Sequence, residues 1–156
     1  AYYQLLWHLG GSQSDIANLT AEDINWKDST ISYRRNKTGV PVVVSFGSEA
    51  AAVLRGLPGA GLLFPRLARI KERHRAKLFI KRLKTVNITG ISLHSYRYAW
   101  AERAKVVGMP ERFAQQALGH NSKAFARAYS RKAQVIVPSL EEYEGKVIAL
   151  PKAVNQ

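Results

Sequence analysis

Cysteine is absent from this chain, which excludes disulfide bonds and thiolate metal sites. Acidic residues are scarce: 11 Asp and Glu stand against 24 Lys and Arg, so the formal net charge is +13. The sequence also lacks a secretory signal and an apolar run of about 20 residues, so we expect neither a membrane-spanning helix nor a membrane partner. These absences favour a cytoplasmic protein that binds a polyanion.

Apolar residues make up 46% of the 156 residues, so the chain has enough apolar mass for a core. We therefore expect residues 1–156 to form a single domain. The first residues, Ala1 to Leu9, show the pattern of a helix without an N-cap, and Met109 is the only methionine. This beginning predicts that the chain is a fragment of a longer protein.

Basic residues concentrate between Arg66 and Lys84, where Glu72 is the single acidic residue. Such a cluster attracts a polyanion, because each neutralised phosphate releases condensed counterions. The alternative is a solvated helix face without a ligand. We expect double-stranded DNA as the partner, with contacts to its backbone from Arg66, Arg69, Lys71, Arg73, Arg75, Lys77, Lys81 and Lys84, and from Arg34 and Arg35 nearer the N-terminus.

The hydrophobic pattern predicts an α+β fold that is mainly helical. Alternating and β-branched residues predict a small three-stranded antiparallel sheet, with residues 36–39 as the turn between its second and third strands. We expect strands at 24–26, 30–34 and 40–45, and helices at 1–9, 14–19, 49–54, 67–84, 94–108, 110–118, about 122–131 and from 139 onward.

The second half of the chain carries residues that suit cleavage of a phosphodiester by a side-chain hydroxyl. Such a reaction needs a nucleophile, donors for the non-bridging oxygens, an acid for the leaving oxygen and a group that orients the nucleophile. Tyr129 has the hydroxyl, and Arg97 has a planar fork of donors that matches a phosphate. His94 lies one helical turn before Arg97, and His120 follows Gly119 at a helix break. Taken singly, each of these residues is more often a packing or capping residue. No spacing of histidines with carboxylates predicts a metal site.

In this order and with these gaps, the motifs resemble the catalytic domain of the tyrosine recombinases, the phage integrase family. That family carries His-x-x-Arg on one helix, then Leu-Gly-His, then its nucleophilic tyrosine. The resemblance covers about residues 1 to 131. The chain matches with His94 and Arg97, with Leu118-Gly119-His120, with Tyr129 nine residues later, with Lys37-Thr38-Gly39 in the hairpin turn, and with Ser14 to Leu19 followed by Glu22-Asp23-Ile24.

The resemblance implies the DNA breaking-rejoining fold and its chemistry. Tyr129 would attack the scissile phosphate and form a 3′-phosphotyrosyl link, while Lys37 protonates the leaving 5′-oxygen. Arg97 and His120 would hold the non-bridging oxygens, and His94 would assist proton transfer or orient the phosphate. A second DNA 5′-hydroxyl would reverse the step, so no nucleotide, metal or small-molecule cofactor is expected.

A biological setting is implied as well. We expect site-specific recombination or integration for a mobile element, with self-association on DNA, in a cytoplasm of bacterial or archaeal type and close to the nucleoid. The tail at 133–156 resembles the C-terminal helix that often docks on a neighbouring protomer in this family, and its alternative is packing on its own domain. Ser139 followed by Glu142 predicts the start of that helix.

The chain departs from the family at Ser12, where the resemblance implies an arginine just before the Ser14-Asp15 pair. A serine hydroxyl is one neutral donor, and losing one transition-state donor costs ~2.7–4 kcal/mol. Arg34 or Arg35 is a candidate substitute, although a strand points alternate residues to opposite faces. Two rival functions follow. One is a non-cleaving DNA-binding relative, and the other is a type IB topoisomerase, which would relax supercoiled DNA without a specific site.

Overall fold

The computed structural model describes residues 1–119 and 136–146, so the expectations for His120, for Tyr129 and for the helix at 122–131 lie outside it. The described elements are α1 (Tyr2–Leu9), α2 (Gln13–Ala17), the 3₁₀ helix η1 (Ala21–Asp23), β1 (Ile24–Asn25), β2 (Thr30–Arg34), β3 (Pro41–Ser45), α3 (Ser48–Arg55), α4 (Pro65–Ala68), α5 (Glu72–Lys84), α6 (Ser95–Val106), α7 (Glu111–Leu118), β4 (Ile136–Val137) and α9 (Leu140–Glu144). The predicted α+β, mainly helical class is confirmed. Within these residues, no helix combines the length and apolar character needed to cross a bilayer.

The sheet contains the three antiparallel strands that were expected and one more. The strand order is β1-β2-β3-β4, and Ile31 of β2 pairs with Val44 of β3. The added strand, β4, lies parallel to β3 and places Val137 opposite Val44. The predicted number of strands was therefore wrong by one, because a two-residue strand is too short to show an alternating pattern.

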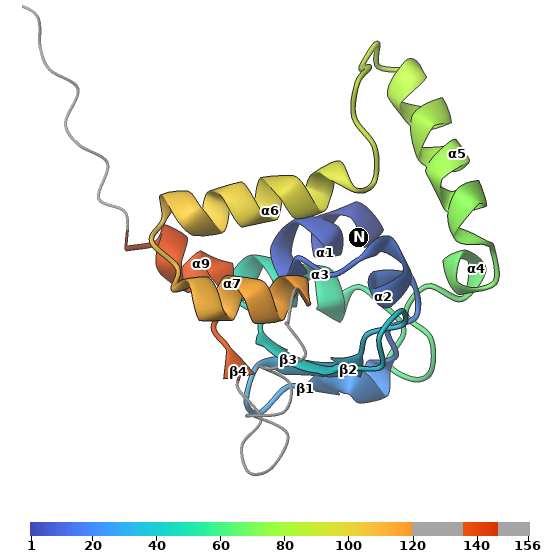
Figure 1. Ribbon diagram of the computed structural model, residues 1–156. Coiled ribbons are helices and arrows are strands. Elements are labelled where there is room, and N and C mark those ends of the chain that lie inside the picture. Colours follow the sequence, from blue (N-terminus) through green and yellow to red (C-terminus); the bar gives the residue numbers. More distant parts are fainter. Residues whose placement is uncertain (120–135, 147–156) are drawn as a thin grey trace, which may run out of the picture.

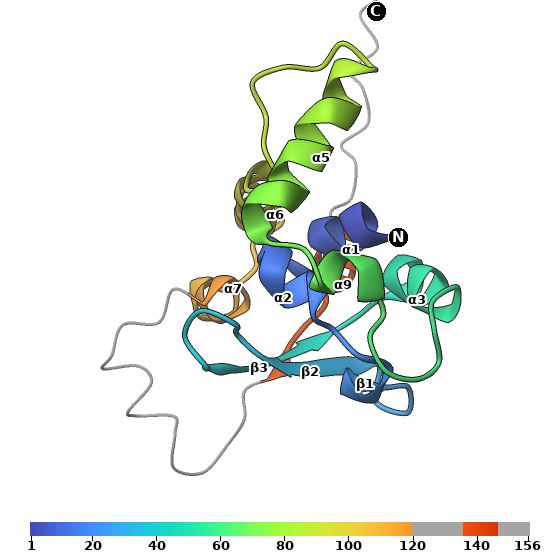
Figure 2. The same ribbon diagram turned by 90° about the vertical axis from the view of Figure 1, so that its right-hand side faces the viewer.

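Helix α1 lies at the centre of the helical layer, which covers one face of the sheet (Figures 1 and 2). Its side chains Leu5, Leu6 and Leu9 are fully buried, and the helix contacts α2, α3, α6 and α9. Burying one leucine contributes about 1.5–3 kcal/mol. The helix expected at residues 1–9 is confirmed, and packing on several sides explains why its sequence is so apolar.

Gly10 ends α1 and allows Trp100 of α6 to pack directly on the backbone. Its φ of 64° lies in the left-handed region, and a Cβ atom at this position would lie 2.8 Å from Trp100 Cδ2. The indole Nε1 of Trp100 donates a hydrogen bond to the His8 carbonyl oxygen at 3.1 Å. Trp100 is a core residue, whereas Trp7 and Trp26 are 39% and 46% exposed.

The helix predicted at 67–84 is divided in the structure into α4 and α5. A buried guanidinium holds the break: Arg75 donates hydrogen bonds to the carbonyl oxygens of Leu67 at 2.9 Å and Ile70 at 2.7 Å. The same side chain donates to Ser14 Oγ at 2.7 Å, which ties α5 to α2. Helix α5 then projects away from the body of the domain (Figures 1 and 2).

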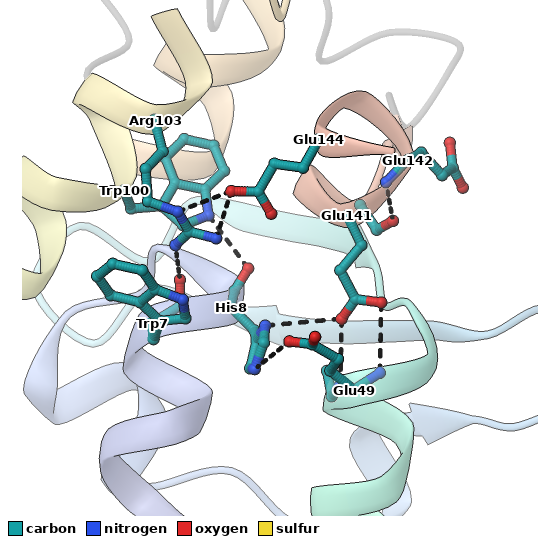
Figure 3. Close-up of polar contacts among 10 residues, drawn as sticks. Trp7, His8, Glu49, Trp100, Arg103, Glu141, Glu142 and Glu144 are labelled. Carbon is teal, nitrogen blue, oxygen red and sulfur yellow. Dashed lines mark hydrogen bonds and ion pairs between the residues drawn. The ribbon is translucent and has the colours of Figure 1, made fainter. Parts of the chain in front are cut away.

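The described part of the tail packs on its own domain (Figure 3). Ser139 Oγ accepts a hydrogen bond from Glu142 N at 3.3 Å, so the predicted start of the last helix is confirmed. The Glu141 carboxylate accepts hydrogen bonds from Glu49 N and Ala50 N, and it thereby caps α3. Docking of residues 133–156 on a neighbouring protomer stays a prediction.

Candidate functional site

The site is built around Arg97, on the first turn of α6. One of its guanidinium nitrogens, Nη1, donates a hydrogen bond to the Gly10 carbonyl oxygen at 3.0 Å, and Nη2 donates to the Leu118 carbonyl oxygen. Arg97 therefore joins α6 to the C-terminal ends of α1 and α7. Burial, and after it the nearby Arg35 charge, lower the pKa of Arg97 from its ordinary value. The arginine stays charged at neutral pH, so the junction carries a partly desolvated positive charge.

Arg35 places a second guanidinium at this junction. It follows β2 directly, and its side chain is only 6% exposed. Its Nη1 lies 3.0 Å from Asp15 Oδ2, and its Nη2 donates to the Gln116 carbonyl oxygen at 3.4 Å. The Nε of Arg35 is buried and has no hydrogen-bond partner in the described part of the chain. The site thus holds one buried donor that the described residues do not use.

Asp15 connects Arg35 to the loop that carries Ser12. The Asp15 carboxylate accepts hydrogen bonds from Ser12 N at 3.0 Å and from Asn36 N at 2.9 Å, in addition to the bond from Arg35. Ser12 Oγ in turn accepts a hydrogen bond from Asp15 N at 3.2 Å. Ser12 is therefore the N-cap of α2 in a capping box. The Ser14 hydroxyl, two residues later, accepts the hydrogen bond from Arg75.

The other predicted catalytic residues occupy different positions relative to this junction. His94 is exposed at the N-terminal end of α6, one turn before Arg97, and its ring meets Tyr98 edge-on at 4.8 Å. Lys37 is exposed in the turn between β2 and β3. Gly119 ends α7 with φ 64° and directly precedes His120. The structure therefore joins Arg97 to the Leu118-Gly119 turn, while His120 and Tyr129 lie outside the described residues.

The residues predicted to contact DNA divide into an exposed set and two buried ones. Arg75 is 5% exposed, and its guanidinium is occupied by the contacts that hold α4 and α5 together. We correct its role to a structural one. Arg35 is also buried, as described above. The exposed set is Arg34, Arg66, Arg69, Lys71, Arg73, Lys77, Lys81 and Lys84.

The sequence reasoning missed the contribution of Asp15 to the site. The signal was present in the spacing Ser12-x-x-Asp15, which fits a capping box. A long-range bond from a strand end to this carboxylate has no sequence signature, so the pairing with Arg35 emerged only from the fold.

A second polar cluster brings together His8, Glu49 and Glu141, whose potential metal-ligand atoms lie within 4.8 Å of one another (Figure 3). His8 Nε2 lies 3.7 Å from Glu49 Oε2, and His8 Nδ1 lies 3.6 Å from Glu141 Oε1. Both oxygens of Glu141 already accept backbone N–H groups of α3. We assign this cluster to the packing of α9 against α1 and α3.

Comparison with known proteins shows the family of this chain. The model of the phage integrase family matches residues 2–135. A curated relative, "Putative integrase/recombinase y4gC" of Sinorhizobium fredii, is 30% identical over 146 residues, which cover 85% of this chain and 76% of that protein.

Solved structures share the fold. The integrase from mycobacterium phage Brujita has a TM-score of 0.63 at 16% identity, over 75% of this chain and 41% of that one. XerA recombinase has a TM-score of 0.60 at 22% identity, over 83% and 51%. The Tn1549 transposon integrase, in complex with transposon right end DNA, has a TM-score of 0.60 at 16% identity, over 82% and 56%. This chain thus spans about half the length of the solved chains. It belongs to the phage integrase family of tyrosine recombinases.

Proposed function

We propose that this chain is the catalytic domain of a site-specific DNA recombinase or integrase, which cuts and rejoins DNA through a 3′-phosphotyrosyl intermediate. One observation carries the proposal: the guanidinium of Arg97 packs on the Leu118-Gly119 turn, directly before His120. Two motifs that lie far apart in the sequence thereby meet at a partly buried positive charge, which is the kind of site that stabilises a phosphate.

The proposed reaction is a transesterification. The Tyr129 hydroxyl oxygen forms a bond to phosphorus, the bond from phosphorus to the 5′-oxygen breaks, and Lys37 gives a proton to the leaving oxygen. Arg97 and His120 donate hydrogen bonds to the non-bridging oxygens, where negative charge grows in the transition state. His94 orients the phosphate or assists proton transfer. The phosphotyrosyl ester retains the energy of the broken bond, so a DNA 5′-hydroxyl restores a phosphodiester without a nucleotide.

The charged surface supports double-stranded DNA as the substrate. Helix α5 projects from the domain and carries exposed basic side chains, among them Arg73, Lys77, Lys81 and Lys84. Neutralising several phosphates gives binding that weakens steeply with salt. We infer that copies of the protein associate on DNA, since exchanging strands between two sites requires cleavage at both. We also infer that this occurs in the cytoplasm, at the nucleoid.

Capture of a covalent adduct tests the proposal. A duplex with a nick near the scissile position loses the short fragment that carries the 5′-hydroxyl, so the cleaved state accumulates. The probe is a set of nicked duplexes drawn from the sequence that flanks the gene in its host genome. We expect an adduct with the unmodified chain and none with Tyr129→Phe. Binding of these duplexes without an adduct would contradict the proposal.

A non-cleaving DNA-binding protein is the second candidate, and Ser12 is the observation that favours it. The serine hydroxyl caps α2, so it is engaged in the fold. Under this alternative, cleavage would appear only after Ser12→Arg. Relaxation of supercoiled plasmid without a specific site would instead indicate a type IB topoisomerase.

A further inference from the structure

The proposed phosphate site has one guanidinium fewer than the family resemblance implies, because position 12, where an arginine is expected, is a serine. The structure brings a guanidinium to this region from another part of the chain. We propose that Arg35 supplies the second guanidinium at the scissile phosphate and so replaces the missing arginine. This inference rests on the proposed function and concerns how its site is completed.

The position of Arg35 relative to Ser12 supports the replacement. Asp15 Oδ2 receives hydrogen bonds from both Ser12 N and Arg35 Nη1, each at 3.0 Å. The Asp15 carboxylate therefore bridges the Arg35 guanidinium and the backbone of Ser12. In the sequence α2, η1, β1 and β2 separate Ser12 from Arg35, so the guanidinium reaches the same place from the hairpin.

The second argument is that Arg35 and Arg97 converge on one turn. Arg35 donates to the Gln116 carbonyl oxygen, and Arg97 donates to the Leu118 carbonyl oxygen, both at the end of α7. A Cβ atom at Gly119 would lie 2.5 Å from Arg35 Nε, so a side chain at this position would displace the Arg35 guanidinium. Both guanidiniums thus lie beside the turn that leads into His120.

The charges at the junction favour an anion. Arg35 forms an ion pair with the buried Asp15 carboxylate, whereas Arg97 feels the Asp15 charge without pairing with it. The Arg35 Nε retains a buried N–H without a partner in the described residues. Bringing like charges together away from water is unfavourable until an anion compensates them. A phosphodiester has the charge and the acceptor oxygens to do so.

The backbone also determines which of the two arginines points inward. Arg34, the last residue of β2, is exposed and donates to the Gly39 carbonyl oxygen at 3.2 Å. Arg35 comes next, and its backbone N–H still pairs with the Val40 carbonyl oxygen at 2.9 Å. Successive side chains along an extended strand point to opposite faces. The alternation therefore selects Arg35 as the substitute and directs Arg34 to the exposed face.

The test compares Arg35→Gln with a control, Arg55→Gln, at an exposed arginine of α3, on two versions of the nicked duplex. One version has a normal scissile phosphate, and the other has a neutral methylphosphonate there. On the phosphate, we expect Arg35→Gln to slow adduct formation about a hundredfold and Arg55→Gln to leave it within about threefold. On the methylphosphonate, the effect of Arg35→Gln should nearly vanish, because no full charge remains to be stabilised. An equal loss on both substrates would show that Arg35 has only a structural role and would overturn the inference.

A second measurement keeps this test separate from the proposed function. In the Tyr129→Phe background, where no cleavage is expected, affinity is measured for intact duplexes with phosphate or methylphosphonate at the scissile position. We expect Arg35→Gln to reduce the preference for phosphate about tenfold. An unchanged preference would overturn the role of Arg35. If the unmodified chain binds the nicked duplexes and forms no adduct, the proposed function fails, while the binding measurement on intact duplexes still decides the role of Arg35.

Discussion

Asp15→Ala should strongly destabilise the folded chain, because the Asp15 carboxylate is 4% exposed and partners a buried arginine. Removing one member of a buried ion pair costs about 3–5 kcal/mol, since the remaining charge stays uncompensated. The carboxylate also accepts the backbone N–H groups of Ser12 and Asn36, so both donors lose a partner. A domain of ordinary stability has about 5–15 kcal/mol in total. We therefore expect a loss of about 4 kcal/mol.

Urea unfolding followed by circular dichroism measures this loss. With a slope of about 2 kcal/mol per molar, the midpoint should fall by about 2 M. Asp28→Ala is the matched control, because Asp28 is exposed and bonds only its neighbour Asn25 among the described residues. Its effect should stay within about 0.5 kcal/mol. The double variant with Arg35→Met should be more stable than Asp15→Ala alone, because the uncompensated guanidinium is gone. A loss for Asp15→Ala as small as that of the control would refute the reasoning.

Glu141→Ala should lower the free energy of unfolding by about 1 kcal/mol, because α3 loses the carboxylate that accepts two of its first N–H groups. Hydrogen exchange at residues 136–146 should also accelerate. The control is Glu142→Ala at an exposed residue, which should change neither the free energy of unfolding nor the exchange rate. Lys81→Gln should reduce the slope of log affinity for DNA against log salt concentration by about 1, the value expected for one lost phosphate contact. Measuring affinity over a range of salt concentrations checks this, and Lys27→Gln at an exposed residue is the control whose slope should stay unchanged. The hydrogen bond from Gly61 N holds the pKa of Glu22 below its ordinary value of 4.5, so this carboxylate stabilises the fold above that pH and loses its effect as pH falls through the lower folded value. Thermal unfolding of Glu22→Gln should therefore depend less steeply on pH below 4.5 than unfolding of the unmodified chain.

Local patterns in the sequence predicted much of the fold. The apolar spacing of residues 1–9, the turn at 36–39 and the cap at Ser139 are short-range signals, and the elements they predict are present. Two elements depended on distant partners instead. β4 has only two residues and exists because β3 offers it a free edge. The break between α4 and α5 depends on Arg75, whose bonds extend to α2.

The features of the site also divide into those that short-range sequence patterns predict and those that depend on contacts between distant residues. The spacing of His94 and Arg97 on one helix follows from helical periodicity, and the sequence was sufficient to predict it. The convergence of Arg35, Asp15 and Arg97 requires β2, α2 and α6 to be packed in their final arrangement. A sequence cannot rank Arg34 against Arg35 as a substitute for the missing arginine until the inward face of the hairpin is known. In the structure Arg35 is buried, so its side chain lies on the inward face of the hairpin.

The most direct test of the account is the chemical identity of the captured protein–DNA linkage. Protease digestion and mass spectrometry of the adduct on a nicked duplex would locate both the modified residue and the DNA end. The account predicts a phosphate ester between the Tyr129 hydroxyl and a 3′-phosphate, with a free 5′-hydroxyl on the released strand. A linkage through another residue or to a 5′-phosphate would contradict it, as would tight binding of the duplex without any linkage.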